Sequence, residues 1–285
     1  MKLLAIKRLA ASLIIVTCSA RLQAADPWAD SIVSYDAGSN PDPGYTTAGS
    51  ALGEPTRFSN PGDPFGGVVT PLSPSFATDE TVSIGAGGHL TVQFAEPVTN
   101  HAANPFGIDL LIFGNSFFGG NFFGGPPDFA YNPAGTVSGV TGDGGAIEVS
   151  SDGVSFIPVA GAADGLFPTN GFSDIALPFT AVAGAVEADF TRPVDPAFNP
   201  VGKTFAQLIA GYAGSGGGWG VDIGAVGLSS VSFVRITNPV GSQATPDIDA
   251  FADVTPVPEP AASSAFLGAA LLFAWQNRKC GYRSA

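Results

Sequence analysis

The chain has 285 residues, with 38 glycines, 24 prolines and only 12% charged residues, and its net charge at pH 7 is −13. Such an acidic surface repels nucleic acid and anionic lipid, which argues against both as partners. The two cysteines, Cys18 and Cys280, lie near the ends of the chain, so the part between them has no disulfide.

The first 25 residues have the order of a secretory signal peptide. Basic residues at positions 2–8 precede an apolar stretch at 9–20, and small residues follow. This apolar stretch is too short for a comfortable membrane span, so the segment predicts export and cleavage. The expected cleavage sites follow Ala20, Ala24 or Ala25. Thr17 stands before Cys18 where a lipoprotein signal wants a small residue, which disfavours lipidation.

The remaining domain, residues 26–255, is more acidic than the whole chain. Four basic and 23 acidic residues give it a net charge of −19. Roughly 230 residues are enough for one large domain with a sizeable core. The excess of carboxylates suits solubility and hard cations such as calcium, which bind through oxygen.

Turn signals rich in glycine and proline recur about every ten residues and predict an all-β domain, an antiparallel β-sandwich or barrel. We expect strands at residues 32–35, 81–84, 89–98, 108–113, 231–237 and 246–254, and a hairpin at 146–159 with its turn at Ser151, Asp152 and Gly153. The run 108–113 is continuously apolar, so we place it in the centre of a sheet. Only residues 204–212 have helical spacing, and a glycine-rich turn is expected at 214–220.

The last expected strand brings several aspartates together if it runs straight. Alternation then places Ile248, Ala250, Ala252 and Val254 on one face, and Asp247, Asp249, Phe251 and Asp253 on the other. Calcium takes six to eight oxygen ligands, several of them from carboxylates. The candidate calcium ligands are Asp109, Asp222, Asp247, Asp249 and Asp253. The alternative is that these aspartates are solvated or cap turns.

Aromatic residues beside glycines are the candidates for ligand binding. Phe117 and Phe118 begin a repeated Phe-Phe-Gly-Gly sequence, and Trp219 stands among glycines. Flat rings on such loops can stack on sugar faces or hold a hydrophobic partner. The favoured alternative is that the rings fold over the end of a sheet and complete the core.

Signatures of catalysis are sparse, and we predict that the protein is not an enzyme. His89 and His101 belong to no spaced metal motif, and no Gly-x-Ser-x-Gly sequence is present. Gly202-Lys203-Thr204 is similar to the end of a phosphate-binding loop, but Ala197 occupies the position of its first glycine. A glycan-active hydrolase needs only two carboxylates, so that alternative stays open.

Several blocks of the domain resemble bacterial cell-surface proteins with a discoidin-like or galactose-binding-like jelly roll. The blocks are residues 51–55, 107–115, 146–156, 216–222 and 233–237, the last leading to 247–253. The resemblance implies a single antiparallel β-sandwich, often with a calcium ion, and in some relatives glycan binding at the loop end. It does not imply catalysis.

The end of the chain has a tripeptide, an uncharged apolar stretch and a basic tail. These are Pro258, Glu259 and Pro260; residues 261–275; and Arg278, Lys279 and Arg283. The apolar stretch is shorter than the roughly 20 residues that a bilayer span needs, and its basic end favours the cytoplasmic side. This order resembles the PEP-CTERM sorting signal of Gram-negative bacteria. In that class an exosortase is thought to cut near the tripeptide and pass the protein to the envelope surface or an extracellular matrix.

We therefore expect three parts: a signal peptide at 1–25 with its signal helix, a β-sandwich at 26–255 and a sorting signal at 256–285 with a transmembrane helix. The expected function is structural or adhesive, at the cell surface or in the extracellular matrix. The expected partners are an exosortase, extracellular polysaccharide and, before processing, the inner membrane through residues 261–275. Three alternatives remain: a calcium-dependent carbohydrate-binding module, a glycan-active hydrolase, and an ordinary membrane anchor that is not cleaved.

Overall fold

The computed structural model of the protein describes residues 26–63, 66–124 and 130–255. The signal peptide, the sorting tripeptide Pro258, Glu259 and Pro260, and the apolar residues 261–275 lie outside these ranges. Within them, no helix is long and apolar enough to cross a membrane.

Most of the regular secondary structure in the described part of the chain is β-strand. Its strands are β1 (Ser31–Asp36), β2 (Phe58–Ser59), β3 (Gly67–Val68), β4 (Val82–Ser83), β5 (His89–Thr99), β6 (Leu110–Gly114), β7 (Phe117–Gly120), β8 (Val137–Thr141), β9 (Ala146–Ser150), β10 (Ile157–Val159), β11 (Trp219–Val221), β12 (Ser230–Thr237) and β13 (Asp247–Asp253). Its helices are the short 3-10 turns η1 (Ala48–Ala51), η2 (Pro105–Gly107) and η3 (Gly224–Val226), and the α-helix α1 (Phe205–Tyr212). The prediction of an all-β class is confirmed.

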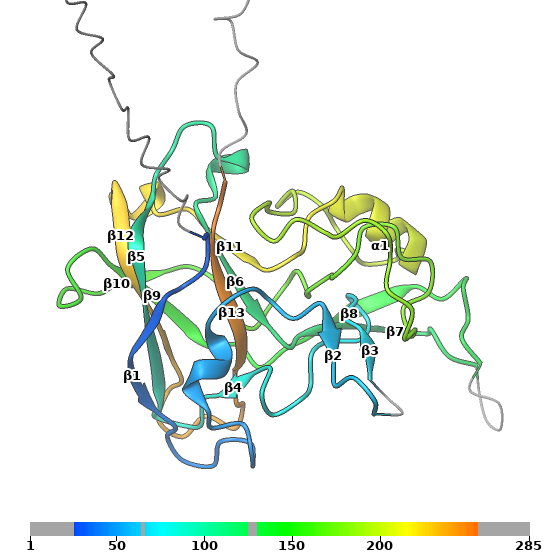
Figure 1. Ribbon diagram of the computed structural model, residues 1–285, viewed down its shortest axis with the longest axis horizontal. Helices are drawn as coiled ribbons and strands as arrows, with labels where there is room; N and C mark the ends of the chain where they lie inside the picture. The colour runs from blue at the N-terminus through cyan, green and yellow to red at the C-terminus, as the bar shows by residue number, and fades with distance from the viewer. Residues whose placement is uncertain (1–25, 64–65, 125–129, 256–285) are drawn as a thin grey trace, which may run out of the picture.

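Two antiparallel sheets face each other across the main core (Figure 1). One has the order β1-β5-β12-β9-β10 and the other β11-β6-β13-β4. Leu90 and Val92 of β5 lie in one hydrophobic cluster with Ile112 of β6 and Phe251 of β13. The alternating pattern of β5 therefore buries one face between the sheets, as its sequence predicted.

The strand β6 is buried at every position because both of its faces are covered. Leu110 and Ile112 point into the main core, whereas Leu111 and Phe113 pack on the outer face with Phe190. The Phe113 and Phe190 rings pack edge to face, and their centroids lie 5.3 Å apart. This double covering explains why the run is continuously apolar and confirms its central place in a sheet.

The predicted faces of the last strand are wrong because β13 contains a bulge. Its register against β6 shifts between Ile248 and Ala250. Ile248 lies in the main core with Phe251, whereas Ala250 and Ala252 pack on the outer face. A bulge inserts one residue and so breaks the simple alternation of faces.

The predicted hairpin is present, but its loop is longer than expected. β9 and β10 pair through Val149 and Ile157, and Val154 is 84% exposed instead of leading the second strand. The Asp152 carboxylate accepts hydrogen bonds from the Val154 and Ser155 amides, which lowers its pKa to about 2.

A second lobe lies beside the sandwich and contains β2, β3, β7, β8 and α1 (Figure 1). Its cluster includes Phe118, Phe205 and Tyr212, which are all buried. The helix begins after Thr204, whose side chain and that of Gln207 form a capping box. The predicted helix is thus confirmed, but the predicted glycine turn is wrong in part, because its last residues belong to β11.

Candidate functional site

The five aspartates predicted to bind calcium are distributed over different parts of the four-stranded sheet. Leu110 pairs with both Val221 and Asp253, so Asp109, Asp222 and Asp253 come to one end of the sheet. Asp247 begins β13 and therefore lies at the opposite end of that strand. Among the described residues, no three His, Cys, Asp or Glu side chains are placed to hold one metal ion. Calcium binding stays a prediction.

Asp109 fixes the connection between β5 and β6. Its Oδ1 accepts hydrogen bonds from the Asn104 side chain (2.7 Å) and the His101 amide (3.4 Å), and its Oδ2 accepts one from the Ile223 amide (3.1 Å). Burial raises the pKa of this carboxyl group. Asp222 similarly accepts a hydrogen bond from the Ala225 amide at 2.9 Å. Both contacts agree with the alternative in which these aspartates cap turns.

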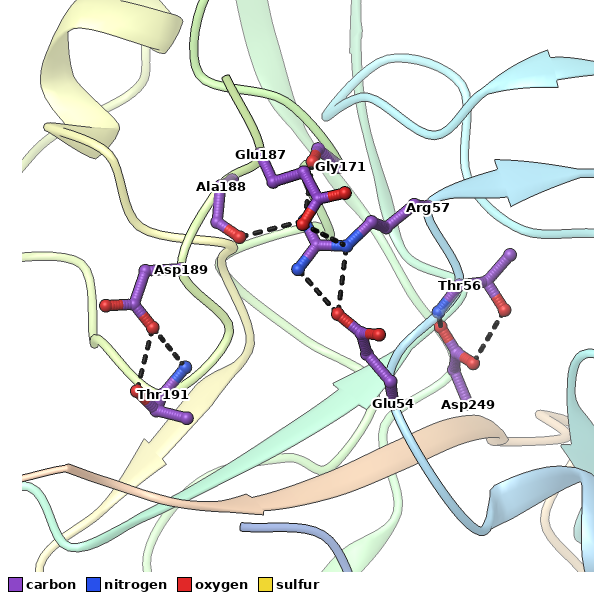
Figure 2. A network of polar contacts seen from close by, with 9 residues as sticks. All are labelled: Glu54, Thr56, Arg57, Gly171, Glu187, Ala188, Asp189, Thr191 and Asp249. Carbon is purple, nitrogen blue, oxygen red and sulfur yellow. Dashed lines mark hydrogen bonds and ion pairs between the residues drawn. The ribbon is translucent and has the colours of Figure 1, made fainter. Parts of the chain in front are cut away.

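Asp249 joins β13 to the segment that follows η1 (Figure 2). Its two oxygens accept hydrogen bonds from the amide (3.0 Å) and the hydroxyl (2.9 Å) of Thr56. Burial raises the pKa of Asp249 to about 7, although the Thr56 hydrogen bonds lower it. Both carboxylate oxygens are thus engaged in a contact that holds the fold together.

Arg57, the next residue, connects the same segment to the loops on the outer face of the sheet (Figure 2). Its guanidinium donates to the Gly171 and Ala188 carbonyl oxygens at 2.7 and 2.8 Å and to Glu54 at 2.6 Å. It also lies 4.1 Å from the centre of the Phe190 ring. Three segments that are distant in sequence therefore meet at one half-buried cation, which makes this network structural.

Asp247 lies among three carboxylates that were not predicted from the sequence: Asp42, Asp143 and Asp164. Asp247 is 4% exposed, and its Oδ2 accepts a hydrogen bond from Asn115 at 3.0 Å. Its Oδ1 is buried and has no hydrogen-bond partner among the described residues. Burial raises its pKa to about 7; the Ser83 side chain lowers it, and the other three carboxylates raise it further by repulsion. These aspartates follow no local pattern, because distant loops bring them together.

The predicted aromatic residues have three different environments. Phe118 is 2% exposed in the core of the second lobe, which agrees with the packing alternative, whereas Phe117 is 37% exposed. Trp219 packs against Gly161, where an added Cβ would lie 2.1 Å from the indole ring. Trp219 also lines an apolar pocket of about 180 Å³ together with Phe167 and Pro193.

A larger cleft, of about 570 Å³, lies beside that pocket and shares Pro193 with it. Its lining residues are Pro105, Phe106, Asp189, Thr191, Arg192, Pro193, Asp195, Gly211, Tyr212, Ala213 and Thr255. They come from η2, from the loop at 189–195, from the end of α1 and from the residues after β13. No local sequence pattern predicts this cleft, because its walls are distant in sequence.

Backbone strain is concentrated at the cleft. Four non-glycine residues of the described chain have positive φ, and two of them are asparagines, which tolerate that conformation. The other two are Phe106 (φ 60°) and Ala213 (φ 50°), and both line the cleft. Ala213 is the left-handed C-cap that ends α1, which is a common helix termination. Phe106 ends no α-helix, its bulky side chain disfavours the left-handed region, and such strain is enriched at functional sites. The cleft is therefore the candidate functional site.

No family model, no curated protein and no solved structure matches this chain. The candidate site is therefore defined by the geometry and chemistry of its own residues.

Proposed function

We propose that the protein is exported and has a structural or adhesive role, without catalysis, at the cell surface or in the extracellular matrix. The observation that carries the proposal is the order of tripeptide, uncharged stretch and basic tail at residues 258–283. The signal peptide order at residues 1–25 supports it independently, because both ends direct the chain out of the cytoplasm.

The domain between these ends supports the adhesive role. Its two antiparallel sheets are compatible with the jelly roll of galactose-binding-like surface proteins, which is the finer topology we propose. Its second lobe adds loops on one side of the sandwich, and a cleft opens between the two parts of the chain that contain Phe106 and Arg192. Binding loops on a rigid scaffold are a common arrangement in recognition proteins.

The export half of the proposal is tested by changing the tripeptide. We expect the full chain, expressed in a host with an exosortase, to be cut and to reach the surface. Replacing Pro258, Glu259 and Pro260 by alanine should leave it uncut in the membrane fraction. The control replaces Pro41 and Pro43, which flank Asp42 in a second Pro-acid-Pro sequence. Unchanged processing of the 258–260 variant would contradict exosortase sorting and favour the uncleaved anchor.

A calcium-dependent form of the role is the second candidate, and one observation favours it. The buried Oδ1 of Asp247 has no partner among the described residues, while Asp42, Asp143 and Asp164 add negative charge around it. No three of the described acidic side chains are placed to share an ion. Backbone carbonyls and water would therefore have to complete the coordination, which calcium accepts.

Thermal melting with millimolar calcium, and then with a chelator, tests the second candidate. Calcium should raise the melting temperature, since a ligand stabilises the state that binds it. The rise should disappear in Asp247→Asn and persist in Asp249→Asn, because Thr56 already occupies both oxygens of Asp249. An equal melting temperature in calcium and chelator would remove calcium from the proposal.

The hydrolase alternative is tested by turnover. Two carboxylates, Asp189 and Asp195, line the cleft, and a glycosidase needs such a pair. We expect no release of reducing ends from matrix polysaccharide. Turnover that disappears in the double variant Asp189→Asn, Asp195→Asn would contradict the non-catalytic role.

A further inference from the structure

We infer that the cleft between Phe106 and Arg192 binds a neutral pyranose saccharide. The inference rests on the proposed adhesive function, because it names the surface that would hold extracellular polysaccharide. Three features of the side chains at the cleft support it. One aromatic ring is exposed, one cation has no partner among the described residues, and two carboxylates each have one oxygen without a hydrogen-bond donor there.

The aromatic ring belongs to Phe106, one of the residues that line the cleft. Phe106 is 56% exposed, although its backbone adopts the left-handed conformation that a bulky side chain disfavours. Asp109 fixes the loop that contains Phe106, because its carboxylate accepts hydrogen bonds from the Asn104 side chain and the His101 amide. The strain at Phe106 is therefore not offset by burial of its own ring. A ring presented in this way offers a flat apolar face for stacking.

Arg192 is a cation without a partner in a very acidic domain. Its guanidinium makes no hydrogen bond or ion pair within the described residues, whereas Arg57 and Arg235 contact Glu54 and Glu148 at 2.6 Å each. The backbone of Arg192 is nevertheless fixed, because its carbonyl accepts a hydrogen bond from the buried Ser215 hydroxyl. Five N–H donors thus remain available at the cleft.

Two carboxylates at the same cleft supply acceptors. The Oδ1 of Asp189 accepts hydrogen bonds from the amide and hydroxyl of Thr191 at 2.9 and 2.7 Å (Figure 2). The Oδ1 of Asp195 accepts one from the Ala197 amide at 2.8 Å. The second oxygen of each carboxylate has no donor within the described part of the chain. These contacts fix both side chains and leave one acceptor on each.

The chemistry of this set fits a sugar ring. Sugar hydroxyls both donate and accept, so they can pair with the Arg192 donors and with the free carboxylate oxygens. A volume of about 570 Å³ lies in the range of small-molecule sites. One cation beside two carboxylates, in a domain with four basic and 23 acidic residues, disfavours a polyanion. Peptide capture usually uses an open strand edge or an apolar groove, and η2 and the end of α1 provide neither.

The experiment measures binding of neutral gluco-, manno- and galacto-configured di- and trisaccharides to the purified protein by titration calorimetry. We expect at least one configuration to bind. Phe106→Gly should weaken it about tenfold while leaving the melting temperature unchanged or higher, because glycine relieves the left-handed strain. Arg192→Gln should weaken it by a similar factor. Loss of binding with retained stability is a result that a purely structural role for Phe106 does not produce.

Two matched variants serve as controls. Phe123→Ala removes a ring of similar exposure (52%) outside the cleft, and Lys203→Gln removes a charge whose side chain makes no hydrogen bond or ion pair among the described residues. Both should bind like the parent protein. The inference is overturned if no neutral saccharide binds, if uronate oligomers or peptides bind in preference, or if the controls lose as much affinity as the cleft variants.

The test separates this inference from the proposed function. A protein that is exported and processed but binds no saccharide overturns the inference alone. A protein that binds saccharides through Phe106 and Arg192 but is not exported overturns only the proposed function. Release of reducing ends would contradict the non-catalytic role while still supporting saccharide binding at this cleft.

Discussion

The sandwich and the second lobe bury aromatic residues by different means. In the sandwich, Phe251 lies on a strand whose neighbours on both sides are hydrogen-bonded, so sheet pairing fixes its position. In the second lobe, Phe118 lies on a strand in a two-stranded sheet and packs against the α-helix and loops. Because its strands pair regularly, the core of the sandwich can be predicted from the sequence. The core of the second lobe depends on loops that meet only in the folded chain.

The largest expected effect is the loss of the Phe251 side chain. Phe251→Ala should lower the free energy of unfolding by about 3–5 kcal/mol, because it leaves a cavity between the two sheets. Phe118→Ala removes the same side chain from the second lobe and should leave most β5 and β12 amides protected in hydrogen exchange. If both variants expose the same amides, the two cores unfold as one unit and the comparison fails.

The next effect concerns the link between these regions. Arg57→Ala removes the donors to the Gly171 and Ala188 carbonyl oxygens, so we expect a loss of about 2 kcal/mol and faster exchange of the loop amides near residue 188. Arg235→Ala is the matched control, because Arg235 also contacts a glutamate and an aromatic ring but lies on the sandwich alone. A larger loss in the control would show that Arg57 is not the main link.

The buried carboxyl groups predict an unusual dependence on pH. Burial raises the pKa of Asp247, Asp249 and Asp253 to about 7 each, so the folded chain holds protons that the unfolded chain releases above about pH 4. Stability should therefore fall as pH rises from about 4 to 7, and melting temperatures should be higher at pH 5 than at pH 8.

The variant Asp249→Asn tests the source of this effect. It removes one titrating group. The difference in unfolding free energy between pH 5 and pH 8 should therefore become smaller by an amount on the order of 2 kcal/mol. Asp152→Asn is the control, because the pKa of Asp152 is lowered to about 2 and its titration acts only below about pH 4. A steeper profile in Asp249→Asn would contradict the pKa direction.

The smallest expected effect is at the start of α1. Thr204→Ala removes the capping box and should cost about 1 kcal/mol, with the change confined to the second lobe. Thr204→Ser keeps the hydroxyl and should restore most of the stability. Equal losses in the two variants would show that the cap does not stabilise the helix.

The strands were predictable where local patterns are strong. The alternation in β5 and the continuous apolar run in β6 each follow from which faces of a strand are buried. The bulge in β13 was not predictable, because it depends on the register against β6. It also changed the expected acidic face, so Asp247 and Asp249 have different partners.

The candidate site was less predictable than the fold. Asp249 and Thr56 are 193 residues apart, and no local pattern connects them. Likewise, no local sequence pattern predicts a shared site for Phe106, Arg192 and Ala213. Only the folded chain shows that the first and last of these have positive φ and that all three line one cleft.

The sequence by itself determined the strong acidity of the domain, its lack of cysteine, its main strands and the one α-helix of the described residues, because charge and hydrophobic periodicity are local properties. It also predicts export and sorting from the two ends. The tertiary structure decided which aspartates are buried, which ring is exposed under strain and which cations have no side-chain partner among the described residues. These depend on contacts between distant segments, and burial and pairing there set the pKa values and the chemistry of the cleft.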